Sequence, residues 1–314
     1  MRRILELPPF FIIFTCLTLA PGCDRSEEPH RIEASFFHGK DLAGRTVTLS
    51  APPVRIISLT PSNTEIVFAL HEEKRLAAVT EFADYPPQAK TLPRVGDLVT
   101  LNLEAIVARD PDLILAGNKL DPDTLRLLEK MEIPTAVTEG TSLDEVYQSI
   151  ELIGRLVGSS DTARGLTATM RDRVNDISRR VAGRPRPQCY FIVSFGAYGN
   201  WTAGPGSFIH EMIELAGGRN AAAGLGQAWG LFSLERLVVI DPDVLLAGKY
   251  SGPISQLAEE PGYRDLSAVK KGHVIILNDD LVGRPGPRLT EGLEALARAL
   301  HPEAFSDERE DGSP

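Results

Sequence analysis

The apolar positions between residues 159 and 183 repeat with the period of a helix. Six side chains in this stretch are spaced by three or four residues: Ala163, Leu166, Met170, Val174, Ile177 and Val181. This spacing places them on one face of an α-helix. The Ser-Ser-Asp run at 159–161 offers N-cap side chains, and Gly183 offers a stop. The pattern predicts one helix over residues 159–183, on the order of 35 Å long at about 1.5 Å per residue.

The predicted helix separates two copies of one motif. Residues 102–117 read NLEAIVARDPDLILAG, and residues 233–248 read SLERLVVIDPDVLLAG. Each copy predicts a short helix, a turn at Asp-Pro-Asp and a buried strand. A motif that occurs once on each side of a long helix indicates two similar lobes, with the helix as a bridge between them.

The hydrophobic runs around the two copies alternate between strand and helix patterns. In the first half we expect an edge hairpin within 34–53, strands at 54–59, 76–80, 112–116 and 135–138, and helices at 62–70, 101–109, 121–131 and 142–157. In the second half we expect strands at 188–195 and 273–278, helices at 207–216 and 289–301, and the repeated helix–strand unit at 234–247. Ser62 and Glu65 have the spacing of a capping box. The alternation predicts an α/β fold of two lobes with parallel β-sheets and flanking helices, bridged by one long α-helix.

Composition and charge narrow the function classes. The chain has 314 residues, which is enough for two lobes with separate cores. Its formal net charge is −10, and no basic patch or RNA-binding motif is present in the sequence. We therefore expect no nucleic-acid partner, and the acidity indicates a soluble surface.

The N-terminus has the pattern of a signal peptide. Arg2 and Arg3 precede the apolar run at 9–20, which is too short to span a bilayer comfortably. The run ends in Leu-Ala-Pro-Gly-Cys at 19–23, which resembles a bacterial lipobox and predicts lipid modification of Cys23. Conventional secretory cleavage is the alternative. Cys189 is then the remaining cysteine of interest, and its apolar neighbours predict a buried strand residue.

These patterns divide the chain into six segments. We expect a signal peptide at 1–22, a lipid-anchored tether with the edge hairpin at 23–50, an N-terminal lobe at 51–158, the bridging helix at 159–183, a C-terminal lobe at 184–305, and a disordered tail at 306–314. The charged composition of the last segment is typical of a frayed terminus.

The loops at the carboxyl ends of the predicted strands carry aromatic residues. In open parallel sheets, ligands bind at these ends, near helix N-termini. Two lobes that face each other in this way enclose a cleft. The predicted cleft loops supply aromatic and charged candidates for ligand binding: Phe82, Tyr198, Trp201, Trp229, Asp280 and Arg284. We expect Tyr85, beside two prolines, to pack within the protein.

Several short motifs resemble a known family. They are Gly-Arg-Thr-Val-Thr-Leu at 44–49, the run PPVRIISLTPSNTE at 52–65, Asp-Tyr-Pro-Pro at 84–87, Asn-Leu-Glu at 102–104, Asp-Pro-Asp-Leu at 110–113, Trp-Thr-Ala-Gly at 201–204 and Asp-Pro-Asp at 241–243. The chain resembles, over residues 40–301, the substrate-binding proteins of bacterial ABC importers of the cobalamin and ferric-siderophore type, and most of all their cobalamin-binding branch. The resemblance implies the class III periplasmic-binding fold, with a helical backbone between the lobes.

The same resemblance implies a docking role for two glutamates. In the cobalamin-binding branch, one glutamate in each lobe contacts arginines of the membrane permease, and these glutamates match Glu104 and Glu235. Both stand at the same position of the internal repeat. A carboxylate that only stabilises the start of a helix is the alternative. Glu65 is left out of this role because the sequence assigns it to a capping box with Ser62.

The ligand implied by the resemblance is a corrinoid, carried as cargo and not as a cofactor. Leu98 and Gly117 stand where the cobalamin-binding branch has tryptophans, so a ferric siderophore or haem stays an alternative. The implied partners are an ABC permease with its ATPase, and the implied location is the periplasm, with a lipid anchor on the cell membrane. We expect a monomer.

Two other function classes are binding of a free metal ion and enzymatic catalysis. Binding of free zinc or manganese needs converging histidines and carboxylates, and no predicted cleft loop holds two histidines. His210 and Glu214 lie in a segment similar to a zinc-protease helix, but glutamate replaces the second histidine. For an enzyme, the sequence shows no nucleophile elbow, P-loop or paired cysteines. We therefore expect no catalytic residues and no protein-bound metal.

Overall fold

The computed structural model describes residues 35–97 and 100–309, and within them two parallel four-stranded sheets carry the fold. The first sheet has the order β4-β3-β5-β6 and consists of β3 (Ile56–Ser58), β4 (Leu76–Val79), β5 (Leu113–Ala116) and β6 (Thr135–Val137). The second has the order β12-β11-β7-β9 and consists of β7 (Gln188–Ile192), β9 (Arg219–Asn220), β11 (Val244–Gly248) and β12 (Val274–Leu277). All the pairs in both sheets are parallel, which confirms the predicted α/β class. We call the parts built on these sheets the N-terminal and C-terminal lobes.

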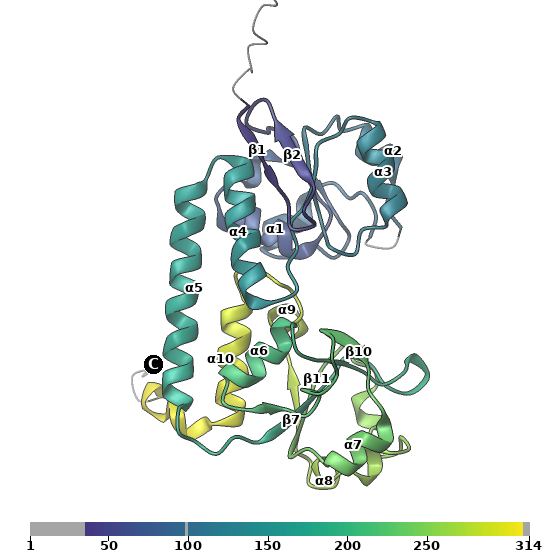
Figure 1. Cartoon of the computed structure of the whole chain (residues 1–314), viewed down its shortest axis with the longest axis vertical. Helices are drawn as coiled ribbons and strands as arrows, with labels where there is room; N and C mark the ends of the chain where they lie inside the picture. Colours follow the sequence, from purple (N-terminus) through teal and green to yellow (C-terminus); the bar gives the residue numbers. More distant parts are fainter. Residues whose placement is uncertain (1–34, 98–99, 310–314) are drawn as a thin grey trace, which may run out of the picture. The chain divides into compact units, whose positions relative to one another are not determined.

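Helices flank both sheets (Figure 1). The α-helices are α1 (Pro61–Ala69), α2 (Leu103–Val107), α3 (Pro122–Lys130), α4 (Leu143–Val157), α5 (Ser160–Val181), α6 (Phe208–Leu215), α7 (Leu234–Ile240), α8 (Ser267–Lys270), α9 (Asp279–Val282) and α10 (Leu289–Leu300). The short 3₁₀ helices are η1 (Glu73–Arg75), η2 (Pro87–Thr91), η3 (Gly196–Tyr198), η4 (Ile254–Gln256), η5 (Tyr263–Asp265) and η6 (Pro302–Arg309). None of the helices in the described ranges is both long and apolar enough to span a bilayer.

Alternate strand residues face opposite layers, because successive side chains of a strand point to opposite faces. In the N-terminal lobe, Leu113 and Leu115 belong to the core that includes α4 and α5, whereas Ile114 packs with Ile106 of α2. In the C-terminal lobe, Phe191 of β7 belongs to the core shared with α5, α6 and α10, whereas its neighbour Tyr190 packs with α7. Thus α2 and α7, which come from the two copies of the repeat, each cover the sheet face that points away from α5.

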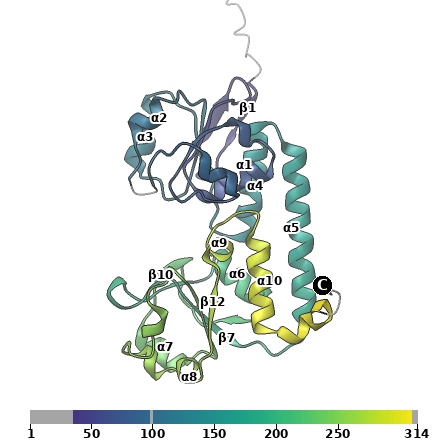
Figure 2. The same ribbon diagram turned by 180° about the vertical axis from the view of Figure 1, so that it is seen from behind.

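The long helix forms where the sequence predicts it. On α5, Ala163, Met170, Val174, Ile177 and Val181 are buried, so the predicted apolar face is the packed face. The helix packs on α4 of the N-terminal lobe and on α6 and α10 of the C-terminal lobe. Figure 2 shows α5 beside α10 from behind. The bridge is therefore held by the cores of both lobes.

The predicted capping box at the start of the first helix is wrong. Helix α1 begins at Pro61, and the Thr60 side chain is the cap, accepting a hydrogen bond from the backbone N–H of Asn63 at 3.2 Å. Proline suits the first turn because it lacks an N–H and its φ is already helical. The cap therefore moves two residues earlier than predicted, and the Glu65 carboxylate is not used as a cap. A capping box is present instead in α4, between Ser142 and Glu145.

Three strands form in segments that were predicted to be loops: β9, which is an edge strand of the second sheet, and a separate pair. β8 (Trp201–Ala203) and β10 (Trp229–Leu231) pair antiparallel, with Trp229 opposite Ala203 and Leu231 opposite Trp201. The segments are short and rich in glycine, so local periodicity does not reveal them, and pairing is set by residues far apart in the sequence. The predicted edge hairpin is confirmed as β1 (Phe37–Lys40) and β2 (Thr46–Leu49).

The predicted burial of Cys189 is confirmed. The residue lies in β7 without solvent exposure, and burial raises the pKa of its thiol to about 12. It is therefore a core residue, because a reactive cysteine requires an accessible thiolate.

The close contact between α4 and α5 gives a test of this packing. A Cβ atom on Gly154 would lie 2.4 Å from the Cβ atom of Ala163, whereas a Cβ atom on Gly165 of α5 would meet nothing within 4 Å. We expect Gly154→Ala to destabilise the protein by about 1–3 kcal/mol, because overpacking outweighs the gain of roughly 1 kcal/mol in helix propensity. The matched Gly165→Ala should stabilise it by about 0.5–1 kcal/mol.

Urea denaturation of both variants measures these free energies of unfolding. Ala163→Gly in the Gly154→Ala background should recover most of the loss, because it removes the clashing methyl group. A Gly154→Ala protein as stable as the Gly165→Ala protein would contradict the described packing of α4 on α5.

Candidate ligand-binding site

A cavity of ≈ 380 Å³ lies between the two lobes. The N-terminal lobe contributes a polar wall, which consists of Asn118, Lys119, Glu139, Gly140 and Thr141. The C-terminal lobe contributes an aromatic wall, which includes Trp201, Phe208 and Trp229. The volume is within the range of about 300–1,000 Å³ that is typical of small-molecule sites.

The strand pair β8–β10 builds the aromatic wall. Trp201 and Trp229 stand at opposite ends of the pair, so the pairing brings together two residues that are 28 positions apart in the sequence. Trp229 packs edge-on against Phe208, with 5.5 Å between ring centroids and 64° between planes. Trp201 is 40% exposed and is therefore available to a ligand. Sequence reasoning missed Phe208, because its position at the start of α6 indicates only a core residue.

The other two predicted aromatic residues do not line this cavity. Phe82 is 60% exposed and Tyr198 is 82% exposed. Tyr198 precedes the β8 strand that carries Trp201, and the backbone carbonyl of Phe82 accepts a hydrogen bond from Arg284 at 3.4 Å. Both lie on segments that contribute to the cleft, and their contact with a ligand stays a prediction.

The polar wall contains a half-buried carboxyl group that the sequence analysis missed. Glu139 follows β6, and its Oε1 atom accepts a hydrogen bond from the Ser62 hydroxyl at 2.6 Å. Burial raises the pKa of this carboxyl group, against the opposing effects of Ser62, the Asn118 backbone and Lys119. The position directly after a parallel strand was the signal that could have identified it.

The predicted polar pair Asp280 and Arg284 is already engaged within the protein. Arg284 forms ion pairs with Asp280 at 2.9 Å, Asp84 at 2.8 Å and Glu65 at 3.1 Å. Burial alone would raise the pKa of Asp84, but the hydrogen bond and charge of Arg284 hold it below its usual value. A ligand that used Arg284 would therefore compete with three carboxylates, and its predicted role in ligand binding stays untested.

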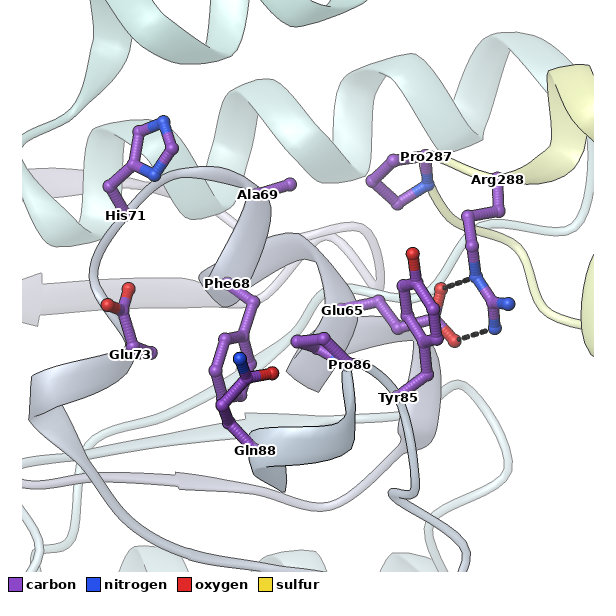
Figure 3. Close-up of a pocket in the computed structure, with 10 residues that line it drawn as sticks. All are labelled: Glu65, Phe68, Ala69, His71, Glu73, Tyr85, Pro86, Gln88, Pro287 and Arg288. Carbon is purple, nitrogen blue, oxygen red and sulfur yellow. Dashed lines mark hydrogen bonds and ion pairs between the residues drawn. The ribbon is translucent and has the colours of Figure 1, made fainter. Parts of the chain in front are cut away.

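Glu65 joins the two lobes. Its carboxylate accepts hydrogen bonds from Arg288 Nε at 2.7 Å and Arg288 Nη2 at 2.6 Å, and Figure 3 shows this two-point contact. Arg288 also stacks on Tyr85, with 3.6 Å from its Cζ atom to the ring centroid. Glu65 is in α1 and Arg288 directly precedes α10, so the contact links the N-terminal and C-terminal lobes. We call Glu65, Asp84, Asp280, Arg284 and Arg288 the inter-lobe ion cluster.

The centre of the inter-lobe ion cluster, Glu65 with Arg284 and Arg288, is more buried than an ordinary surface ion pair. Glu65 is 4% exposed. Removing one partner of a buried ion pair destabilises a protein by about 3–5 kcal/mol, because the remaining charge is buried without a partner. A second hollow of ≈ 480 Å³ adjoins the cluster, between Phe68, Pro86 and Pro287 (Figure 3). The expected packing role of Tyr85 agrees with its stacking on Arg288.

The histidine considered for zinc binding has other partners. His210 Nδ1 lies 3.1 Å from the side-chain nitrogen of Asn220, and Glu214 forms an ion pair with Arg186. Across residues 35–97 and 100–309, no group of three or more His, Cys, Asp and Glu side chains is placed to hold a metal ion.

Glu104 and Glu235 occupy matching, exposed positions. Each is the second residue of its helix, after the capping residues Asn102 and Ser233. A hydrogen bond from Ser233 at 2.7 Å lowers the pKa of Glu235 below its usual value. One helical turn after each glutamate is an exposed valine, at positions 107 and 238, so the two helices present the same pair of side chains.

Comparison with known proteins agrees with this architecture. Residues 56–281 match the periplasmic binding protein family. An uncharacterized ABC transporter substrate-binding lipoprotein of Bacillus subtilis is 32% identical over 85% of this chain and 86% of its own length. A cobalamin-binding protein of Halobacterium salinarum is 32% identical over 83% of this chain and 73% of its own length.

A solved structure shares both the fold and part of the sequence. The periplasmic heme-binding protein of Roseiflexus sp. RS-1 in its apo form superposes with a TM-score of 0.72 at 29% identity, covering 80% of this chain and 98% of that one. The parallel sheets, the bridging helix and the matched sequence over residues 56–281 lead to one conclusion. The chain belongs to the periplasmic binding protein family, and its relatives include an ABC transporter substrate-binding lipoprotein and proteins named for binding cobalamin and haem.

Proposed function

We propose that this protein captures a corrinoid in the cavity between its lobes and delivers it to the permease of an ABC importer. The observation that carries the proposal is the position of both tryptophans of the chain on one wall of that cavity, opposite a polar wall. A corrin ring has large apolar faces and a rim of polar side chains, so it can contact both walls at once. The 32% identity to a cobalamin-binding protein supports this choice.

The size of the cavity supports a ligand that reaches beyond it. A corrinoid is larger than ≈ 380 Å³, so part of the ring system would extend past Trp201. Tyr198 lies three residues before Trp201, and Leu231 is opposite Trp201 in the β8–β10 pair. Their side chains are 82% and 59% exposed. These side chains can cover the part of the ligand that the cavity does not enclose. Micromolar binding needs about 8 kcal/mol, which several aromatic contacts over a few hundred Å² can supply.

Haem and ferric siderophores are the second candidates. One solved relative is a periplasmic heme-binding protein, and haem is also a flat chelate with apolar faces. Free zinc or manganese is a weaker candidate, because no suitable metal-binding group is present among the described residues.

The location and partners follow from the proposed role. We propose that Cys23, which lies outside the described residues, is lipid-modified and anchors the mature protein on the periplasmic side of the cell membrane, as a monomer. A relative named as a substrate-binding lipoprotein supports the anchor. We propose that the exposed Glu104 and Glu235 contact basic residues of the permease.

Ligand binding can be tested by titration. We expect submicromolar affinity for cyanocobalamin, measured by quenching of tryptophan fluorescence, and weaker binding of haem and of a ferric siderophore. Trp201→Ala should weaken corrinoid binding by about tenfold or more, since an aromatic contact supplies roughly 1–2 kcal/mol. Tyr250→Ala, an exposed aromatic outside the cavity, is the control and should bind as the wild type does. Tight binding of zinc or of a small sugar, with none of the three chelates bound, would refute the proposal.

Docking predicts a separation of transport from binding. We expect the double variant Glu104→Arg and Glu235→Arg to lower transport by about tenfold or more, because like charges at an interface cost several kcal/mol. Affinity for the ligand should stay within about threefold, since neither residue lines the cavity. The matched control replaces Glu132 and Glu259, which are exposed elsewhere. Normal uptake by the Glu104/Glu235 variant would remove both residues from the mechanism.

Lipidation predicts membrane attachment through one residue. We expect Cys23→Ala to move the protein from the membrane fraction to the soluble periplasmic fraction, with ligand affinity unchanged. Acyl chains supply about 0.8 kcal/mol per buried CH₂, which a protein of net charge −10 cannot replace by attraction to anionic lipids. Retention of the variant with membranes at the wild-type level would refute the lipid anchor.

A further inference from the structure

The Glu139 carboxyl group is a fixed polar point in the ligand cavity. It lines the cavity between the lobes and also a hollow of ≈ 290 Å³ in the N-terminal lobe, which is distinct from the hollow beside the inter-lobe ion cluster. A Cβ atom on Gly117 would lie 2.9 Å from Glu139 Oε2 and 2.6 Å from Thr60 Cγ2. The glycine therefore leaves the space in which this carboxyl group sits.

A chain of hydrogen bonds that starts at α1 ends on the Glu139 carboxyl group. The Asn63 backbone N–H donates to Thr60 Oγ1 at 3.2 Å, Thr60 Oγ1 and Ser62 Oγ are 2.9 Å apart, and Ser62 Oγ donates to Glu139 Oε1 at 2.6 Å. Because Thr60 already accepts from Asn63 and Ser62 donates to Glu139, the Thr60 hydroxyl donates to Ser62. All three residues before Glu139 are buried. This hydrogen bond restricts the side-chain conformation of Glu139, so reorienting the carboxyl group to accommodate a repelling ligand would require breaking it.

The equivalent position in the other lobe also holds a carboxylate, but that carboxylate lies outside the inter-lobe cavity. Gly248 ends the second copy of the repeat as Gly117 ends the first, and a Cβ atom there would overlap Asp279, which follows the next strand of that sheet. Asp279 accepts a hydrogen bond from the backbone of Tyr250 at 3.3 Å and does not line the inter-lobe cavity. The two lobes therefore share this arrangement, but of these two carboxyl groups only that of the N-terminal lobe lines the inter-lobe cavity.

We propose that Glu139 is a specificity-determining residue that selects corrinoids with uncharged amide side chains over corrinoids with carboxylate side chains; this inference rests on the proposed function. A carboxylate accepts hydrogen bonds from amide N–H groups and repels another carboxylate, and both effects are strong where water is excluded. Lys119 lines the same wall with the opposite charge, but it is exposed, so solvent weakens its field. Glu139, which is half-buried and held by Ser62, sets the preference.

Two corrinoids with the same ring test the proposal. Dicyanocobinamide carries amides around its ring, and dicyanocobyrinic acid carries carboxylic acids. Their dissociation constants would be measured by fluorescence quenching at pH 8, where a carboxyl group with a raised pKa is more fully ionised than at neutral pH. We expect the wild type to prefer the amide form by about tenfold or more, as hydrogen bonds to charged groups imply.

Three variants test whether the preference for the amide form depends on Glu139. Glu139→Gln, which keeps the shape of the side chain, should reduce the preference to within about threefold, mainly by improving binding of the acid form. Lys119→Gln should increase the preference. Asp279→Asn, the equivalent carboxylate of the other lobe, should leave it unchanged. Circular dichroism and the urea midpoint confirm that each variant is folded.

The outcomes distinguish the role of Glu139 from corrinoid binding itself. A reduced preference in Glu139→Gln alone supports the inference. If both corrinoids bind but Glu139→Gln keeps the wild-type preference, or Asp279→Asn changes it equally, Glu139 has only a structural role and the inference is wrong. If neither corrinoid binds to the wild type, the proposed function itself fails, and the inference fails with it.

Discussion

The buried carboxylate of Glu65 is the constraint on which the arrangement of the lobes depends. It is 4% exposed and meets two guanidinium groups, from Arg284 and Arg288, that belong to the other half of the chain. A charge buried to this extent is tolerated only with its partners in place. Separating the lobes at this point would leave Glu65 without them, so the ion cluster connects the lobes in addition to α5 and to the hydrogen bonds between residues 141–143 and α6. We infer that the cleft is largely formed before the ligand arrives.

The two copies of the repeat give the lobes the same helix–strand scaffold. The residues that follow each copy differ and give the cavity its two walls. Both copies build a helix that carries an exposed glutamate and a strand with a glycine at its end or directly after it. In both lobes that glycine makes room for a carboxylate from the next part of the sheet. The lobes then diverge: the N-terminal lobe presents Glu139 and Lys119 to the cavity, and the C-terminal lobe presents its tryptophans. A duplicated scaffold thus supplies two walls of different chemistry.

Local patterns in the sequence identified the features that depend on local physics. The apolar face of α5, the strand around Cys189 and the hairpin of β1 and β2 were predicted because burial and turn chemistry act over a few residues. The presence of Trp201 and Trp229 in the cleft was predicted from their position after strands, and the cavity contains both. The partners of Glu65 were missed because they lie 219 and 223 residues away, and the local capping pattern offered a simpler role. The pairing of β8 with β10 was missed for the same reason.

We propose that the cleft holds a corrinoid, and the most direct test is the absorption spectrum of the full-length protein purified from its native cell envelope. Corrinoids, haem and ferric siderophores are all coloured and differ in their visible bands. A corrinoid in the cleft should give its own bands, in an amount that approaches one per protein and that is lower in Trp201→Ala, which binds more weakly. A haem Soret band in place of the corrinoid bands, retained at one per protein, would contradict it.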